Sequence, residues 1–371
     1  MKKSILVLAV TAALAAPLAT QADTILYGSA RVSVDYNDVK LGLIDQVPGV
    51  SDPDSAWNVV NNDSRLGVQG SEDLGGGLSA IYQYEFGVDV TEGGNFEGNR
   101  PKFVGLKGNW GSLTLGTQET PYYGVTGVTD IFNSFNTFGA TAWLGGSFNG
   151  YTLTPTEGAA SRSEGSLLRL DNSVLYNTPD FNGFSASVLL SMASPPNSVD
   201  GWSNSVDIWN ISAKYSNGPF FAGVTYIALD GKDNISLNGV PVLSLNLDQW
   251  ALGLGYNSGP FNLGFIYENG TYNQWGLIQP FVEEFIGNTD KPWNAYLTGS
   301  YTFGNNVISA AYGQLDTGIS GQDNIDNYIV GYQYNFSKRT RLWVEYIGRN
   351  ADNEIFYGDQ NAVSIGTRVD F

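Results

Sequence analysis

The sequence predicts an all-β protein, a transmembrane antiparallel β-barrel of roughly sixteen strands. Three observations predict it. Segments of about ten residues alternate apolar side chains with small or polar ones, which is the period of strands that have one apolar face. The connections alternate between short turns and long polar loops. Beyond residue 22, no stretch has the roughly 18 consecutive apolar residues that a membrane helix requires.

The segment 24–36 shows the alternation clearly. Its even-numbered residues from Leu26 to Tyr36 are apolar or small, whereas the odd-numbered ones from Ser29 to Asp35 are polar. Because successive side chains of a strand point to opposite faces, one face can contact lipid or a neighbouring subunit and the other water. The same pattern predicts strands near 63–71, 77–89, 100–108, 112–118, 168–177, 184–192, 206–216, 220–230, 247–256, 261–271, 293–303, 307–316, 325–336, 340–349 and 361–371.

The connections fall into two length classes. Short turns are predicted near 109–111, 217–219, 258–260, 304–306 and 337–339, and long loops at 37–62, 119–167, 231–246 and 272–292. Short periplasmic turns and long extracellular loops are typical of outer-membrane barrels, whereas a soluble β-sandwich, the alternative, has no reason to sort its loops. The final segment ends on Phe371, and pairing it with the first strand would leave no open edge in lipid.

Residues 1–22 are typical of a secretory signal peptide. Lys2 and Lys3 precede an apolar run over 5–18, and Thr20-Gln21-Ala22 provides a small-x-small cleavage site. The alternative is a membrane-anchor helix, for which the run is short. We therefore expect a signal peptide at 1–22 and a barrel domain at 23–371, exported to the outer membrane.

The composition excludes several functions. The chain has no Cys and no His, which removes disulfides, His- or Cys-ligated metals and His-based acid–base catalysis. No cofactor is expected, and an enzyme would be restricted to Ser-Lys or carboxylate chemistry, for which no motif is present. With 18 basic and 36 acidic residues the net charge is −18, so nucleic acid is not an expected partner. Acidic loop residues could bind divalent cations shared with lipopolysaccharide, or simply form a solvated surface.

Four stretches carry a family resemblance: TILYGSARVSVDY from Thr24, SRLGVQGSEDLGGGLSAIYQYEF from Ser64, RPKFVGLKGNWGSLTLGTQETPYY from Arg100 and DNSVLYNTPDFNGFSASV from Asp171. With the C-terminal strand, they make the chain resemble the general trimeric porins of Gram-negative proteobacteria. The resemblance implies a sixteen-stranded homotrimer among outer-membrane lipid and lipopolysaccharide. It also implies a water-filled channel for passive diffusion of ions and small hydrophilic solutes. The alternatives are a substrate-selective channel of the same architecture and a structural or adhesive barrel with a plugged lumen.

The resemblance also implies a constriction. The third external loop, which is long and spans 119–167, would fold into the lumen; its aromatic residues suit packing against a wall, and a disordered external loop is the alternative. The family places basic wall residues opposite acidic residues of this loop. Arg65 and Arg100 carry over from the matched motifs. Alternation adds Arg31, Arg169 on the premise that Leu170 and Val174 face outward, and Lys102 on the premise that Phe103 faces outward. Asp130 is the strongest loop acid, followed by Glu119, Glu157 and Glu164.

Two departures from the family pattern affect the balance of positive and negative charge at the constriction. Thr117 follows Leu115-Gly116 where family members often have Arg, and Ser134-Phe135 stands in place of Glu-Phe. Small residues on the outward parity of the first strands, such as Gly28, Ala30, Gly70 and Ala80, suggest a surface for a neighbouring subunit.

Overall fold

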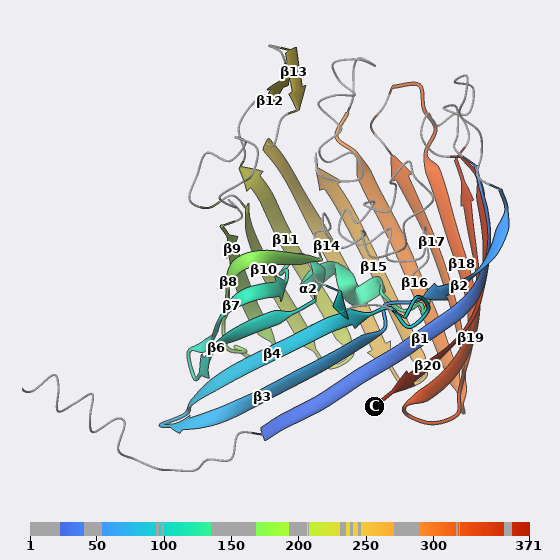
Figure 1. Ribbon diagram of the computed structural model, residues 1–371. Helices are drawn as coiled ribbons and strands as arrows, with labels where there is room; N and C mark the ends of the chain where they lie inside the picture. Colours follow the sequence, from blue (N-terminus) through green and yellow to red (C-terminus); the bar gives the residue numbers. More distant parts are fainter. Residues whose placement is uncertain are drawn as a thin grey trace, which may run out of the picture.

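The computed structural model is a closed antiparallel β-barrel with one short α-helix in its lumen (Figure 1). It describes residues 23–40, 54–93, 96–97, 100–134, 168–192, 206, 208–230, 235–237, 240–243, 246–270, 290–316, 318, 320–351 and 358–371. Among these residues, no helix is long and apolar enough to cross a membrane. The predicted signal peptide lies outside the described residues.

Sixteen strand positions form the barrel wall. Two positions are each filled by two strands: β2 (Ala56–Asn61) and β3 (Arg65–Gly75) both pair with β1 (Asp23–Val39), and β5 (Phe96–Glu97) and β6 (Lys102–Gly108) both pair with β4 (Leu78–Val88). The other wall strands are β7 (Gly111–Glu119), β8 (Arg169–Asn177), β9 (Phe184–Ser191), β10 (Ile208–Asn217), β11 (Phe220–Asp230), β14 (Asn246–Ser258), β15 (Phe261–Gly270), β16 (Trp293–Phe303), β17 (Asn306–Asp316), β18 (Ile325–Asn335), β19 (Thr340–Asn350) and β20 (Gln360–Asp370). The predicted fold class and strand number are confirmed.

Three short strands lie inside segments predicted as long connections. β2 continues the barrel wall beyond β3, because the 17-residue β1 extends past β3 and pairs with β2. β12 (Ile235–Leu237) and β13 (Val240–Leu243) form a separate hairpin that stands away from the wall (Figure 1). The wall is therefore higher on the β1 side than the sequence alone indicates.

The barrel closes between its first and last strands. β1 pairs with β20 from Ser29↔Asp370 to Val39↔Gln360. Beyond this ladder, the N–H of Gly28 donates to the carbonyl of Phe371 and the N–H of Phe371 donates to that of Gly28, each at 3.0 Å. Each backbone group satisfied here would otherwise face hydrocarbon, where an unpaired one is costly. The predicted closure of the sheet is confirmed.

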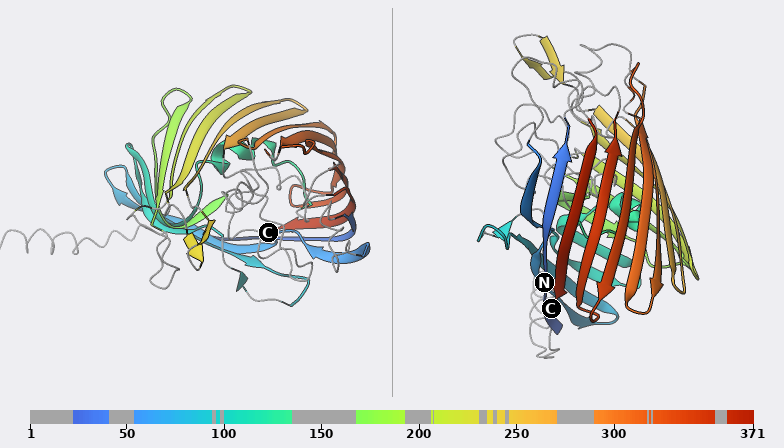
Figure 2. Two further views of the ribbon diagram at one scale, coloured as in Figure 1. Left: turned by 90° about the horizontal axis from the view of Figure 1, so that it is seen from above. Right: turned by 90° about the vertical axis from the view of Figure 1, so that its right-hand side faces the viewer.

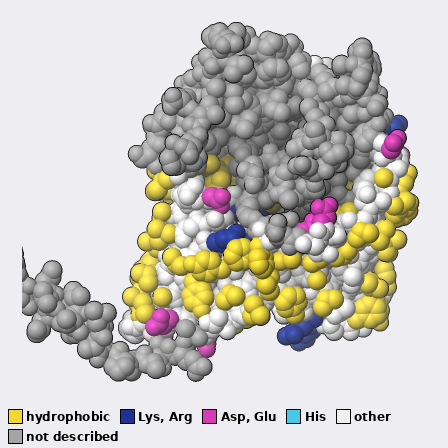
Figure 3. Space-filling model, viewed as in Figure 1, with side chains coloured by type: hydrophobic (Ala, Val, Ile, Leu, Met, Phe, Trp, Pro, Cys, Tyr) yellow, Lys and Arg dark blue, Asp and Glu magenta, His cyan; other side chains and the backbone are white. Residues whose placement is uncertain are grey.

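Alternation sorts the side chains of the wall. In β1, Ser29, Ser33 and Asp35 are buried toward the lumen, whereas Leu26 and Val34 are exposed on the outside. Hydrophobic side chains are spread over the outer wall (Figure 3), as expected of a surface that contacts lipid. Polar residues dominate the inner face, so the interior is suited to water.

Two small residues of the predicted subunit surface are covered by aromatic rings of the same chain. A Cβ at Gly28 would collide with the ring of Phe371, and one at Gly70 with the hydroxyl end of Tyr82. Neither glycine therefore offers a bare surface to a partner. Instead, each gives an aromatic ring room to lie across the strand.

We expect Gly28→Val to weaken closure of the barrel, because the new side chain would displace the Phe371 ring from its place over β1. Overpacking of this kind costs about 1–3 kcal/mol. The temperature at which the folded band converts to the unfolded band on a detergent gel should fall by several degrees. Gly299→Val is the control, because its nearest neighbour is the flexible end of Leu263 at 3.1 Å; equal shifts in both variants would contradict the assignment.

Candidate functional site

The chain turns into the lumen after β7. Residues 120–134, here called the lumenal loop, include α2 (Tyr123–Thr126) and the 3-10 helix η2 (Gly127–Thr129). Seen along the barrel, this segment lies within the ring of strands (Figure 2). The prediction that the third loop folds into the lumen is thus confirmed for these residues, and 135–167 lie outside the described residues.

Glycines on the inner wall make room for the loop. A Cβ at Gly253 would collide with the carbonyl of Val125, and one at Gly264 with that of Val128. Gly223, which pairs with Gly253 across β11 and β14, lies beneath the Val125 side chain. The loop backbone therefore seats directly on the wall, at positions where any larger residue would lift it off.

Buried polar groups hold the first end of the loop. The N–H of Tyr122 donates to Oδ1 of Asn210 at 2.7 Å, and its hydroxyl donates to Oε1 of Glu268 at 2.8 Å. Nε2 of Gln249 donates to the Tyr122 hydroxyl, and Nδ2 of Asn294 donates to the other oxygen of Glu268, both at 2.7 Å. Three strands thus fix one tyrosine against the wall.

Glu345 of β19 holds the other described end. Its carboxylate oxygens accept the backbone N–H groups of Asn133 at 2.8 Å and Ser134 at 2.7 Å. Nδ2 of Asn133 also donates to Oε1 of Gln333 at 2.8 Å. Since Glu345 is only 2% exposed, the loop supplies most of the hydrogen-bond donors for this carboxylate.

Three arginines form a row across adjacent strands. Arg31 of β1 is the register partner of Arg368 of β20, and Arg368 is the partner of Arg341 of β19. All three line a lumenal cavity of about 260 Å³, together with Asp130 of the loop. Asp370 pairs with Arg368 at 2.7 Å and with Arg341 at 3.1 Å. Like charges directly opposite in a sheet are destabilising, so this row, here called the arginine row, indicates a role other than stability.

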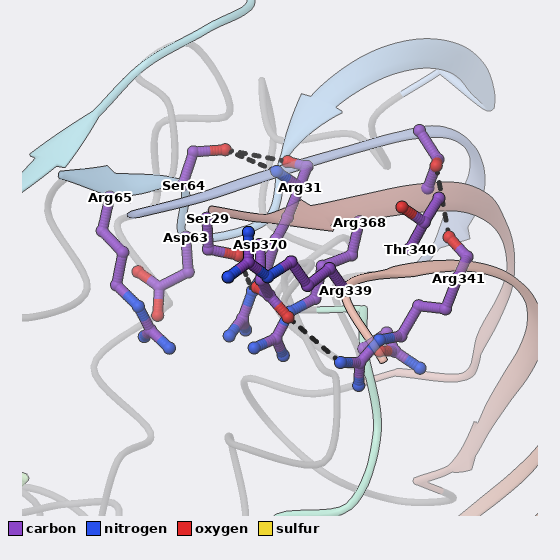
Figure 4. Close-up of polar contacts among 12 residues, drawn as sticks. Ser29, Arg31, Asp63, Ser64, Arg65, Arg339, Thr340, Arg341, Arg368 and Asp370 are labelled. Carbon is purple, nitrogen blue, oxygen red and sulfur yellow. Dashed lines mark hydrogen bonds and ion pairs between the residues drawn. The ribbon is translucent and has the colours of Figure 1, made fainter. Parts of the chain in front are cut away.

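Arg65 and Arg100 lie in a second charged group next to the row. Arg100 pairs with Asp63 and with Glu85, the latter at 3.4 Å. Asp63 lies between β2 and β3 and has a φ of 70°. Arg65 is 3.9 Å from Glu85, which also accepts the Tyr27 hydroxyl at 2.9 Å. The guanidinium groups of Arg65 and the arginine row extend to the same side of the wall (Figure 4).

Lys102 does not face the lumen. Its Nζ lies 5.0 Å from the ring centroid of Phe86, a residue of outward parity, and donates to the carbonyl of Arg100 at 3.3 Å. Val104, two residues on, is exposed on the outside, whereas Phe103 lines a lumenal cavity. The expected lumenal orientation of Lys102 is therefore wrong, because the premise that Phe103 faces outward is wrong.

Arg169 and Glu119 pair with each other on the adjacent strands β8 and β7, where β7 ends and the lumenal loop begins, rather than across the pore. Nη2 of Arg169 lies 3.6 Å from Oε1 of Glu119. Leu170, expected to face outward, packs instead against the buried cluster of Tyr122, Ile227 and Ala251. Arg169 is nevertheless close enough to Asp63 and Asp130 to act on both carboxyls electrostatically. Glu157 and Glu164 lie outside the described residues.

Asp130 faces the arginine row from the loop. Its Oδ2 accepts the Tyr123 hydroxyl at 2.9 Å, and Arg31 is one of its electrostatic neighbours. The carboxylate has access to lumenal water, but the surrounding wall and loop limit its hydration, and this desolvation raises its pKa above the usual range of an aspartate.

The sequence reasoning missed Arg341, Arg368, Asp63 and Glu85. The signal for the first two was present: Leu342 and Val344 are outward, as are Ile365 and Val369, so alternation places Arg341 and Arg368 inside. Among the described residues, no group of three or more acidic side chains is placed to hold a metal ion. Several of the acidic loop residues considered for divalent cations lie outside the described residues.

A closed barrel with an apolar outside, a wet charged inside and a loop seated in its lumen is the architecture of an outer-membrane channel. The family model described as Gram-negative porin matches residues 8–354, and the chain belongs to this family. It is 26% identical to an outer membrane porin protein of Bordetella pertussis, over 100% of this chain and 99% of that protein.

Solved structures of other outer-membrane proteins share the fold at lower sequence identity. The anion-selective porin from Comamonas acidovorans matches with a TM-score of 0.69 at 21% identity, over 95% of this chain and 100% of its own. The Vibrio cholerae OmpT, described as in its trimer form, matches with a TM-score of 0.60 at 14% identity, over 94% of this chain and 99% of its own. The protein is an outer-membrane porin, a channel for passive diffusion.

Proposed function

We propose that the arginine row, with Arg65 and Arg100, is the basic side of the pore constriction and that Asp130 is its acidic side. The observation that carries the proposal is the register of Arg31, Arg368 and Arg341 across three adjacent strands, in one cavity with Asp130. Arg169 and Glu119 flank this site as an ion pair.

Passive diffusion needs no catalytic group. The lumenal loop sets the size limit, and the charged side chains set a field across the opening. Arginine stays charged at any relevant pH. Guanidinium groups on one side and a carboxylate on the other would orient dipolar solutes and influence the passage of ions. We therefore propose an open pore for ions and small hydrophilic solutes rather than an enzyme.

Reconstitution into a planar lipid bilayer tests the proposal. We expect discrete conductance steps in KCl that rise in proportion to salt, and reversal potentials that change in Arg65→Ala and Arg100→Ala. KCl conductance that saturates as the salt concentration rises, instead of rising in proportion to it, would favour the substrate-selective alternative, and an absence of steps would favour a plugged barrel. An unchanged conductance and reversal potential in both variants would contradict the constriction assignment.

We expect the ion selectivity to change with pH through Asp130. Because desolvation raises its pKa, the carboxyl takes up a proton above the usual value of about 3.9 for aspartate. As pH falls through the raised pKa, the negative charge opposite the arginine row is lost and the reversal potential should shift toward anions. Asp130→Asn should show the shifted value at neutral pH and a flatter pH profile. The same pH profile in both proteins would rule out Asp130 as the titrating group.

We propose that residues 1–22 are a signal peptide and that the barrel of residues 23–371 is a homotrimer surrounded by outer-membrane lipid and lipopolysaccharide. The position of Lys102 supports an outer surface that a neighbouring subunit covers. Its charge lies on the outer side of the wall over Phe86, and an outward charge is costly within hydrocarbon. The OmpT structure of similar fold is of a trimer form. A trimer-sized band on an unheated detergent gel, lost on boiling, would support the assembly; a monomer under all conditions would contradict it.

A further inference from the structure

A second cavity inside the barrel is lined by the start of the lumenal loop and does not include Asp130. It has a volume of about 440 Å³ and is lined by residues of β3, β4, β6–β10 and the start of the loop. Ligand pockets have volumes of about 300–1,000 Å³, with apolar walls and a few placed polar groups. This cavity is thus large enough to hold a small organic solute rather than only water.

Its wall carries an apolar patch where a water-filled barrel is ordinarily polar. Ile81 of β4, Phe103 of β6 and Leu175 of β8 all line the cavity. Phe103 is the register partner of Gln83, two residues from Ile81, so the first two side chains are diagonal neighbours on adjacent strands. Pro101 and Pro121 extend the apolar lining. A water-filled passage alone does not require such a surface.

One charge in this cavity has no counter-charge among the residues that the structure describes. Lys214 of β10 lines it, with Nζ 3.5 Å from the position that a Cβ would occupy on Gly124 of α2. Within the described part of the chain, this ammonium forms no ion pair and no side-chain hydrogen bond.

The acids of the cavity, by contrast, are already paired. Glu85 lies against Arg100 at 3.4 Å and Arg65 at 3.9 Å, and Glu119 against Arg169 at 3.6 Å. The available charge is therefore positive. It lines the same cavity as the apolar patch.

We propose that this cavity is a binding subsite for small monocarboxylates that have an apolar body. The carboxylate pairs with Lys214, and the apolar body lies on Ile81, Phe103 and Leu175. Charge complementarity selects the anionic group, and burial of apolar surface selects the body. The inference rests on the proposed open pore and adds a solute class to it: such a solute pauses in the subsite instead of passing without contact.

Single-channel recording with three probes tests the subsite. Benzoate carries both features, acetate lacks the apolar body, and benzyl alcohol lacks the charge. We expect benzoate to interrupt or reduce the KCl current in a saturable manner, and acetate and benzyl alcohol to have little effect at the same concentration. Block by benzyl alcohol equal to that by benzoate would overturn the role of the carboxylate, and block by acetate equal to that by benzoate would overturn the role of the apolar patch.

Two variants separate the contributions. Lys214→Gln should raise the half-blocking concentration of benzoate about tenfold, corresponding to ~1.4 kcal/mol, and Lys214→Arg should retain the block. Phe103→Ser should weaken benzoate block and leave Lys214 in place. The control is Lys291→Gln, because Lys291 pairs with Asp248 at 3.1 Å outside this cavity and is 55% exposed.

The outcomes distinguish the two proposals. An absence of KCl conductance in the wild-type protein would contradict the pore itself. Normal KCl conductance with benzoate block that is unchanged in both Lys214→Gln and Phe103→Ser would overturn the subsite alone. Heat-modified mobility on a detergent gel shows whether each variant is folded, and Lys214→Arg supplies a charge-conserving test if Lys214→Gln does not fold.

Discussion

Replacing Arg31, Arg341 and Arg368 together by glutamine is expected to shift the reversal potential in a KCl gradient strongly toward that of a cation-selective channel. The three guanidinium groups form one row and line one cavity, so a passing ion interacts with all of them. A unit charge 4 Å away contributes about 1 kcal/mol in water, and salt reduces this at longer range. Loss of three charges should change the permeability ratio of chloride to potassium by about tenfold, since ~1.4 kcal/mol is a factor of ten.

Arg339→Gln is the matched control. Arg339 is an exposed residue of the turn between β18 and β19 and lies outside the row's cavity. We expect this variant to keep the wild-type reversal potential. A triple variant that also keeps it, with normal conductance steps, would show that the arginine row does not face the ion path.

The same triple variant should not lose stability. Opposed like charges weaken a sheet, and glutamine keeps two N–H donors in place of the five of the guanidinium. We expect its unfolding temperature in detergent to equal or exceed that of the wild-type barrel. A row that is neutral or unfavourable for stability but required for selectivity would identify these arginines as functional residues.

Regular strands explain why much of the fold could be predicted. β1 and β20 alternate without interruption, so parity places Arg31 inside correctly and would have placed Arg368 inside as well. The lumenal orientation predicted for Lys102 was wrong for a physical reason. The prediction assigned an aromatic side chain to the lipid face, but Phe103 lies on the lumenal face, where it lines the second cavity. Where a functional position places an apolar residue toward the lumen, alternation predicts the wrong orientation for it and for its neighbours.

Local irregularities account for another error. The pairing of β7 with β8 shifts register between Gly116 and Gln118, and Asn172 has a positive φ of 51°. Each irregularity changes which face the following side chains occupy. Leu170 therefore packs against the buried cluster that contains Tyr122 instead of facing lipid. No pattern of apolar residues records such a shift, because the residue types on either side remain compatible with a strand.

Long-range contacts were beyond the sequence for a different reason. Asp63 and Glu85 are separated by more than twenty residues and meet only through Arg100. Glu345 meets the lumenal loop across more than two hundred residues of chain. Composition and periodicity describe one strand at a time, so they do not show which buried carboxylate accepts hydrogen bonds from which loop.

Removal of the Glu345 carboxylate is the second change with a large expected effect. Glu345→Ala deprives the N–H groups of Asn133 and Ser134 of their acceptor, at a position that is only 2% exposed. A buried donor left without an acceptor costs about 1–3 kcal/mol. The end of the lumenal loop should then leave the wall, with broader and noisier conductance steps and faster liposome swelling in sugars that the wild-type channel excludes.

Glutamine at the same position separates the hydrogen bonds from the charge. The amide oxygen of Glu345→Gln can still accept from the loop, whereas its NH₂ group cannot, so this variant should lose part of the tether. An order of wild type, Gln and then Ala in rising current noise and sugar permeability would show that the accepted N–H groups hold the loop. Glu72→Ala, at an exposed position of β3, should behave as wild type. If Glu345→Ala keeps the wild-type exclusion size and noise, the glycine seat beneath Val125 and Val128 is by itself sufficient to hold the loop, and the size limit of the pore is set there.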